Sequence, residues 1–153
     1  MIYQILDSQK IIISGSDPQT PEDFAELRRL GISHIINLQM GYVDFFIPKD
    51  RNHEIHLADK VNILTTHLMM SDFMAPTFED LDCALSILNK YEGVYFHCRR
   101  GKDRTGMVRA AFRVLQQNWD VEKAIKEMDD LGHAKFPYFW WQPHLKKYII
   151  SRK

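Results

Sequence analysis

The chain has 153 residues, of which 45% are hydrophobic and 26% are charged, so it is long enough for one compact domain, which we expect to span residues 1–153. Lysine plus arginine and aspartate plus glutamate both number 20, so the overall charge favours neither nucleic acid nor an anionic membrane, and any anion site has to be local. Two cysteines do not make a disulfide framework, and no basic stretch precedes a long apolar run, so we interpret the chain as cytoplasmic and without a transmembrane segment.

Short apolar runs alternate with amphipathic stretches, which predicts an α/β domain whose central sheet is mostly parallel and flanked by helices. Ile11–Ile13 is the first predicted strand. A helix is expected to begin after Thr20, whose hydroxyl can cap it, and to end at Gly31. The β-branched run His34–Leu38 predicts an inner strand, and Gln39–Lys60 predicts a long polar loop.

The second half of the chain continues the alternation and then adds helices. The predicted elements are a strand Val61–Leu68, a break Ser71–Pro76, a helix from a Thr77 cap to Tyr91, a strand Val94–His97, a helix Thr105–Gln117, a helix capped by Asp120, and a last helix from Gln142.

The segment Val94–Gly106, VYFHCRRGKDRTG, carries the strongest chemical signal. It places Cys98 at the end of a strand, Gly101 in a tight loop, and Arg104 and Thr105 at the start of a helix. Loop amides and a helix N-terminus converge there on one point, which favours a bound tetrahedral anion.

The same electrostatic field acts on the sulfur of Cys98. A positive helix terminus and a nearby arginine favour the thiolate, which is the nucleophilic form of cysteine. Arg104 can hold two phosphate oxygens with its planar guanidinium. The segment therefore predicts a nucleophilic cysteine beneath a phosphate site.

The stretch from His97 and Cys98 to Arg104 and Thr105 resembles the HCx5R[ST] signature of the cysteine-dependent protein tyrosine and dual-specificity phosphatases. The order of elements also resembles compact dual-specificity phosphatases, except in Gln39–Lys60. The resemblance implies a metal-independent phosphatase without a cofactor, in which Cys98 forms a phosphocysteine. It further implies that Thr105 assists departure of the thiolate and that His97 orients the loop.

Members of this family also need an acid that protonates the leaving oxygen. Asp72, in the turn-like stretch MSDFMAP, is our first candidate. Asp103 is the second, because the GKDRTG loop resembles loops of myotubularin-like lipid phosphatases and of some bacterial phosphatases. Asp103 could equally pair with a nearby arginine.

The loop is strongly basic, and we predict that Arg99, Arg100, Gly101, Lys102 and Asp103 bind the substrate. The loop resembles that of tensin-like lipid phosphatases, where extra cations engage additional phosphates of an inositol ring. We therefore expect inositol polyphosphates or phosphoinositides, with phosphotyrosine or dual-specificity protein substrates as the close alternative. The partner is thus a phosphorylated small molecule, a lipid headgroup or a phosphoprotein, and nucleic acid is not expected.

Three other features have plainer interpretations. We expect Cys83 to be a packed core thiol rather than a resolving thiol for Cys98. His53 and His56 lie in a charged loop without the further ligands of a zinc site. The aromatic cluster Lys135–His144 could dock on a membrane or stack bases, but packing of the last helix explains it more simply.

Two other functions remain open. A rhodanese-like sulfurtransferase also uses a cysteine followed by a tight loop, although it would lack the Thr105-Gly106 helix start and an upstream acid. A catalytically silent phosphate-binding module is the alternative of another class, but Cys98 and Arg104 are both present.

Overall fold

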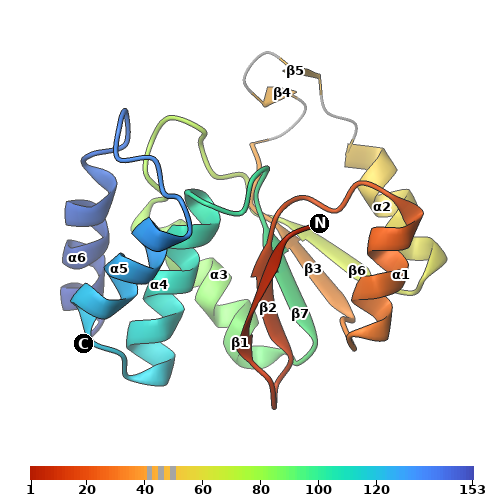
Figure 1. Ribbon diagram of the computed structural model, residues 1–153, viewed down its shortest axis with the longest axis horizontal. Coiled ribbons are helices and arrows are strands. Elements are labelled where there is room, and N and C mark those ends of the chain that lie inside the picture. Colours follow the sequence, from red (N-terminus) through yellow and green to blue (C-terminus); the bar gives the residue numbers. More distant parts are fainter. Residues whose placement is uncertain (41–42, 45–46, 49–50) are drawn as a thin grey trace.

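The computed structural model describes residues 1–40, 43–44, 47–48 and 51–153, and of residues 43, 44, 47, 48 and 51 only the backbone. Its centre is a five-stranded sheet in the order β1-β2-β7-β3-β6 (Figure 1). The first strand pairs antiparallel with the second, and the other neighbours are parallel. The strands are β1 (Tyr3–Asp7), β2 (Ile12–Gly15), β7 (Val94–His97), β3 (His34–Asn37) and β6 (Leu64–His67).

Helices cover both faces of the sheet (Figure 1). One face packs against α3 (Phe78–Lys90) and α4 (Arg104–Gln117), with α5 (Val121–Asp130) and α6 (Trp141–Arg152) packed on α4. The other face packs against α1 (Pro21–Arg29) and α2 (Arg51–Lys60). This confirms the predicted α/β fold with a mostly parallel sheet.

Successive residues of each inner strand point alternately to the two faces of the sheet and so pack into two different hydrophobic clusters. Ile36 and Phe96 join the cluster beneath α3 and α4, whereas Ile35 and Tyr95 join the cluster beneath α1 and α2. Because both faces are covered, the inner strands are fully buried, and they read in the sequence as continuous apolar runs.

Local capping explains two of the helix starts that the sequence predicts. Thr20 accepts a hydrogen bond from the backbone amide of Asp23, and the Asp23 carboxylate accepts one from the amide of Thr20. Thr77 and Asp80 form the same reciprocal pair at the start of α3. Each pair satisfies amide groups that a helix terminus leaves without partners.

The predicted loop Gln39–Lys60 is wrong over much of its length. The backbone pairs β4 (Val43–Asp44) with β5 (Ile47–Pro48), and α2 follows, so that His53 and His56 lie on a helix. Residues 41–42, 45–46 and 49–50 of the predicted loop lie outside the described residues. The buried face of α2 includes Glu54 beside Leu57 and Ala58. Because Glu54 is polar, the sequence lacks the regular apolar spacing that predicts a helix.

Smaller corrections concern a strand, a strand boundary and a thiol. β1 was not predicted, since of its five residues only Leu6 is buried. The strand predicted from Val61 begins at Leu64, because a turn occupies the residues before it. Cys83 is exposed rather than packed, since the buried positions of α3 are on the opposite side of the helix.

The register of the parallel strands determines where a site can form. Gly15 and Asn37 both pair with His97, and Asn37 also pairs with His67, so four strands end side by side at their carboxyl edge. The segments that leave these strands meet there, and this edge is where open α/β sheets bind ligands. No helix in the described part of the chain has the length and apolar character needed to cross a membrane.

Candidate active site

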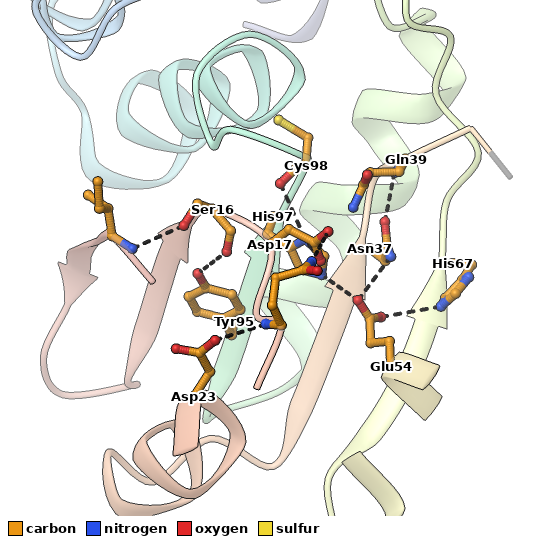
Figure 2. Close-up of polar contacts among 12 residues, drawn as sticks. Ser16, Asp17, Asp23, Asn37, Gln39, Glu54, His67, Tyr95, His97 and Cys98 are labelled. Atoms are coloured by element: carbon orange, nitrogen blue, oxygen red, sulfur yellow. Dashed lines mark hydrogen bonds and ion pairs between the residues drawn. The ribbon is translucent and has the colours of Figure 1, made fainter. Parts of the chain in front are cut away.

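The predicted cysteine lies at this carboxyl edge. Cys98 directly follows β7, is only 3% exposed, and lines a pocket of about 530 Å³. Figure 2 shows its sulfur pointing away from the imidazole of His97. The pocket is lined by Asp72, Cys98, Arg99, Arg100, Asp103, Arg104, Tyr138 and Trp141.

The loop after Cys98 packs tightly against the end of β2. Gly101 has φ +70°, and a Cβ there would lie 2.5 Å from the backbone carbonyl group of Gly15. The amide of Asp17 also donates to the carbonyl of Arg99, at 3.3 Å. The loop therefore needs glycine both for its left-handed conformation and for this close approach.

Arg109 supports the same loop from α4, and the sequence analysis missed it. Its Nε donates to the hydroxyl of Ser14 and its Nη2 to the carbonyl of Gly101, both at 3.0 Å. The side chain is 2% exposed. The available signal was an arginine in the otherwise apolar stretch GMVRAAF, since a buried arginine requires partners.

Arg104 and Asp72 meet at the wall of the pocket. Arg104 begins α4, and its Nη1 lies 2.5 Å from a carboxylate oxygen of Asp72 and 3.3 Å from the carbonyl of Met70. Both side chains are buried, at 7% and 5% exposure. The structure thus brings the predicted arginine and the first-ranked acid together beside Cys98.

Behind the loop, His97 lies between two carboxylates (Figure 2). Its Nε2 is 3.0 Å from Glu54, its Nδ1 is 3.6 Å from Asp17, and the ring is fully buried. Its Nδ1 also lies 3.4 Å from the carbonyl oxygen of Cys98. His97, for which we predict an orienting role, thus contacts two acidic side chains: Asp17, which follows β2, and Glu54 on α2.

Glu54 is the second functional residue that the sequence analysis missed. It accepts from the side-chain amide of Asn37 at 3.0 Å and lies 3.4 Å from the Nε2 of His67. Burial raises the pKa of Glu54, but the charge of His97 and the bonds to His67 and His97 outweigh this and bring it below its ordinary value. Glu54 is therefore a buried anion that links α2, β3, β6 and β7.

Asp17, Glu54 and His97 are also the one group among the described residues whose spacing could hold a metal ion, with one ligand atom each within 4.8 Å of the others. However, the two carboxylates face different nitrogens of the His97 ring. One ion can bind only one of those nitrogens, so the geometry fits a carboxylate–imidazole–carboxylate chain better than a metal centre.

Asp103, the second-ranked acid, is bound by the segment before α6. One of its carboxylate oxygens accepts a hydrogen bond from the backbone amide of Ala134. The same oxygen lies 2.9 Å from that amide nitrogen and 2.9 Å from Nδ1 of His133. Its other oxygen lies 3.8 Å from Arg100. Burial raises the pKa of Asp103, but the bonds to His133 and Ala134 and the charges of His133 and Arg100 lower it overall.

The remaining predicted residues separate into two groups. Arg99 and Arg100 are exposed and line the pocket. Lys102 does not line it: its Nζ packs over Gly132, and its side chain borders a smaller cavity of about 80 Å³ behind the loop. Thr105 is fully buried, and its hydroxyl has no hydrogen-bond partner among the described residues.

The fold and the site agree with the predicted resemblance to cysteine-based phosphatases of the protein tyrosine phosphatase-like superfamily, and a family model and a curated relative assign the chain to it. A family model described as "Polymorphic toxin system, DSP-PTPase phosphatase" matches residues 13–118, a range that includes Asp72 and the whole loop from Cys98 to Arg104. The chain therefore belongs to this family of phosphatases.

Individual relatives agree with this assignment. The dual specificity protein phosphatase TpbA of Pseudomonas aeruginosa is 41% identical over 102 residues, which cover 62% of this chain and 43% of TpbA. The match thus spans less than half of that relative. The catalytic domain of the PP-IP phosphatase Siw14 from S. cerevisiae has a TM-score of 0.76 at 23% identity, covering 95% of this chain and 83% of its own. PTPMT1, in a complex with PI(5)P, has a TM-score of 0.72 at 20% identity, covering 97% and 95%. These two likenesses concern the fold.

Proposed function

We propose that the chain hydrolyses phosphomonoesters through a phosphocysteine on Cys98. The observation that carries this proposal is the placement of buried Cys98 in one pocket with Arg104 at a helix N-terminus and with Asp72. A dianion in this pocket would meet loop amides, the positive end of α4 and a guanidinium, the groups that stabilise charge on a transferring phosphoryl group.

In the first step the Cys98 thiolate attacks phosphorus, a P–S bond forms and the ester P–O bond breaks. The leaving oxygen takes a proton from Asp72. In the second step water attacks phosphorus and gives its proton to Asp72, and the P–S bond breaks to release phosphate and the thiolate. The buried hydroxyl of Thr105 is proposed to stabilise that departing sulfur, and His97 to position the loop.

The contacts of the two acids favour Asp72 as the proton donor. Asp72 pairs with Arg104, so a bound phosphate would compete for the same guanidinium and leave the Asp72 carboxyl facing the substrate. Asp103 is bound by His133 and Ala134, and these contacts lower its pKa, which makes it the poorer proton donor. We assign Asp103 to holding the segment before α6.

Hydrolysis of an aryl phosphate in the presence of EDTA tests the nucleophile. Cys98→Ser should lower kcat by at least about a thousandfold, since one member of a nucleophilic site often carries most of its rate. The exposed Cys83 offers a matched control, and Cys83→Ser should keep the wild-type rate. Equal rates for wild type and Cys98→Ser would overturn the proposal.

The acid is tested with leaving groups of different basicity. A poor leaving group needs its proton in the transition state, so Asp72→Asn should cost about a hundredfold on an alkyl phosphate and much less on a nitrophenyl phosphate. Asp103→Asn should show no such dependence on the leaving group. If Asp103→Asn shows it and Asp72→Asn does not, the two assignments are reversed.

For the substrate, we propose inositol polyphosphates or phosphoinositides, because Arg99 and Arg100 are exposed at the pocket and can bind phosphates beyond the reacting one. Siw14 is a PP-IP phosphatase and PTPMT1 is known in complex with PI(5)P, and both have this fold. The relative TpbA is a dual specificity protein phosphatase, which keeps phosphoproteins as the second candidate.

A substrate panel separates the two candidates. Arg99→Ala and Arg100→Ala should each lower kcat/KM about tenfold for an inositol polyphosphate, the usual effect of one charge-assisted bond, and much less for a phosphotyrosine peptide. Lys102→Ala is the control, because Lys102 faces away from the pocket. Equal losses on both substrates, or a comparable loss with Lys102→Ala, would remove the basis for the inositide preference.

A catalytically silent phosphate-binding module is the proposal's rival of another class. Such a module would bind a phosphorylated ligand equally well in the wild type and in Cys98→Ser without releasing phosphate from it. Phosphate release by the wild type, and its loss in Cys98→Ser with binding retained, excludes this alternative.

A further inference from the structure

Exposed apolar side chains gather around the pocket, and packing of the domain does not explain them. Twelve large hydrophobic residues are exposed in the described part of the chain, and six of these lie in two segments, residues 69–74 and 136–140. We call these six the apolar rim. They are Met69 (64% exposed), Phe73 (51%), Met74 (64%), Phe136 (86%), Phe139 (70%) and Trp140 (37%).

The two segments of the apolar rim flank the same pocket. Asp72 of the first segment lines it, as do Tyr138 of the second segment and Trp141 directly after it. Figure 1 shows the connections from β6 to α3 and from α5 to α6 projecting at the same end of the molecule. A surface that receives the rim therefore also covers the mouth of the pocket.

The second segment is anchored without the help of its most exposed rings. Trp141 is fully buried and Tyr138 nearly so, with their ring centroids 4.5 Å apart, and Asp103 binds the amide of Ala134. Phe136 and Phe139 project into solvent from this anchored backbone. Removing their rings should leave the fold intact, so their exposure indicates contact with something outside the chain.

The charge around the pocket indicates what that partner is. Arg99 and Arg100 are exposed cations that line the same pocket, whereas Asp72 is paired with Arg104, and Asp103 contacts His133 and, at 3.8 Å, Arg100. Projecting aromatic and methionine side chains around cations fit the boundary between acyl chains and anionic headgroups of a membrane. Peptides usually bind in a groove or along the edge of a sheet, whereas these rings project from the surface.

We propose that the apolar rim docks on the surface of membranes that contain anionic lipids, and that the pocket then receives a phosphomonoester carried by a lipid headgroup. The identity of the substrate rests on the proposed phosphatase function, but the docking does not. Docking would place Cys98 over headgroups in the plane of the membrane, so a lipid-borne phosphate would be favoured over a free inositol phosphate.

Flotation with phosphatidylcholine vesicles, with and without phosphatidylglycerol, tests the docking. The Cys98→Ser background avoids any turnover of lipid. Binding should require the anionic lipid, weaken with added salt, and fall at least about tenfold in the double variant Phe136→Ser, Phe139→Ser, since each ring buries apolar area at the interface. The matched control is Leu64→Ser, Ile150→Ser, which removes side chains of similar exposure, 70% and 75%, distant from the pocket.

Kinetics with active enzyme test the consequence. The double rim variant should lose hydrolysis of a phosphoinositide in vesicles and keep hydrolysis of an aryl phosphate within about twofold, because neither Phe136 nor Phe139 lines the pocket. Equal vesicle binding by the rim and control variants would overturn the proposal. Loss of activity on a phosphopeptide with vesicle binding unchanged would also overturn it, in favour of a protein partner. Rim-dependent vesicle binding without any phosphatase activity would refute the proposed function and leave the docking standing.

Discussion

Glu54→Gln should destabilise the protein strongly at neutral pH, although residue 54 precedes the signature loop by more than forty positions. The wild-type carboxylate is buried and faces His97, His67 and Asn37. Glutamine has nearly the same shape, so the variant removes the charge and one of the two acceptor oxygens without creating a cavity. What remains is the buried His97 and the half-buried His67, which have lost their shared anion.

The magnitude follows from this loss of a buried partner. Removing one member of a buried ion pair costs roughly 3–5 kcal/mol, and we take about 3 because the glutamine oxygen keeps one bond. For a domain of this size, 1 kcal/mol corresponds to about 2–4 °C in Tm, so the midpoint should fall by about 6–12 °C at pH 7. Asp59→Asn is the matched control, since it removes an exposed acid from the same helix and should shift Tm by less than about 2 °C.

The pH dependence provides the decisive measurement. The folded protein holds the pKa of Glu54 below its unfolded value of 4.5, so its contribution is complete above that pH and is lost progressively as the pH falls toward the lowered folded pKa. The difference in unfolding free energy between wild type and Glu54→Gln, from urea melts, should therefore be present at pH 7 and shrink as the pH falls below about 4.5. A difference that is absent at pH 7, or that does not change below pH 4.5, would refute the reasoning.

Three further predictions test the support of the loop. Arg109→Met should raise the inhibition constant for vanadate at least about tenfold, because the carbonyl of Gly101 loses a buried donor, and Ser14→Ala, which removes only the other bond, should have a smaller effect. Gly101→Ala should abolish aryl phosphate hydrolysis and lower Tm, because the added Cβ meets the backbone of Gly15 at a positive φ; full activity would contradict the described packing. Asp103→Asn should lower the unfolding free energy by about 1–3 kcal/mol at pH 7, and the difference from wild type in urea melts should shrink below pH 3.8, since the folded pKa is depressed.

The sequence predicted those parts of the site that are contiguous along the chain. A strand, a glycine loop and a helix start within thirteen residues determine most of the geometry around Cys98 and Arg104 by local rules. The two capping boxes were predictable for the same reason, because each needs only four neighbouring residues.

The orientation of individual loop side chains was beyond such rules. The spacing that placed Arg99, Arg100 and Lys102 in one basic rim cannot distinguish a side chain that lines the pocket from one that turns behind the loop. The packing of Lys102 over Gly132 depends on where α5 ends relative to the loop, which is a tertiary fact. The substrate argument therefore rests on two exposed cations rather than three.

The supporting residues Glu54 and Arg109 were missed because the sequence does not show the partners of a buried charge, even where an apolar stretch such as that around Arg109 indicates burial. The partners of Glu54 come from β3, β6 and β7, which only the sheet order brings together. Each strand end contributes one residue at matching register, and α2 supplies the anion between them. A buried carboxylate at residue 54 would be strongly destabilising without Asn37, His67 and His97. The presence of Glu54 on α2 therefore indicates that the site, and not only the fold, requires this strand register.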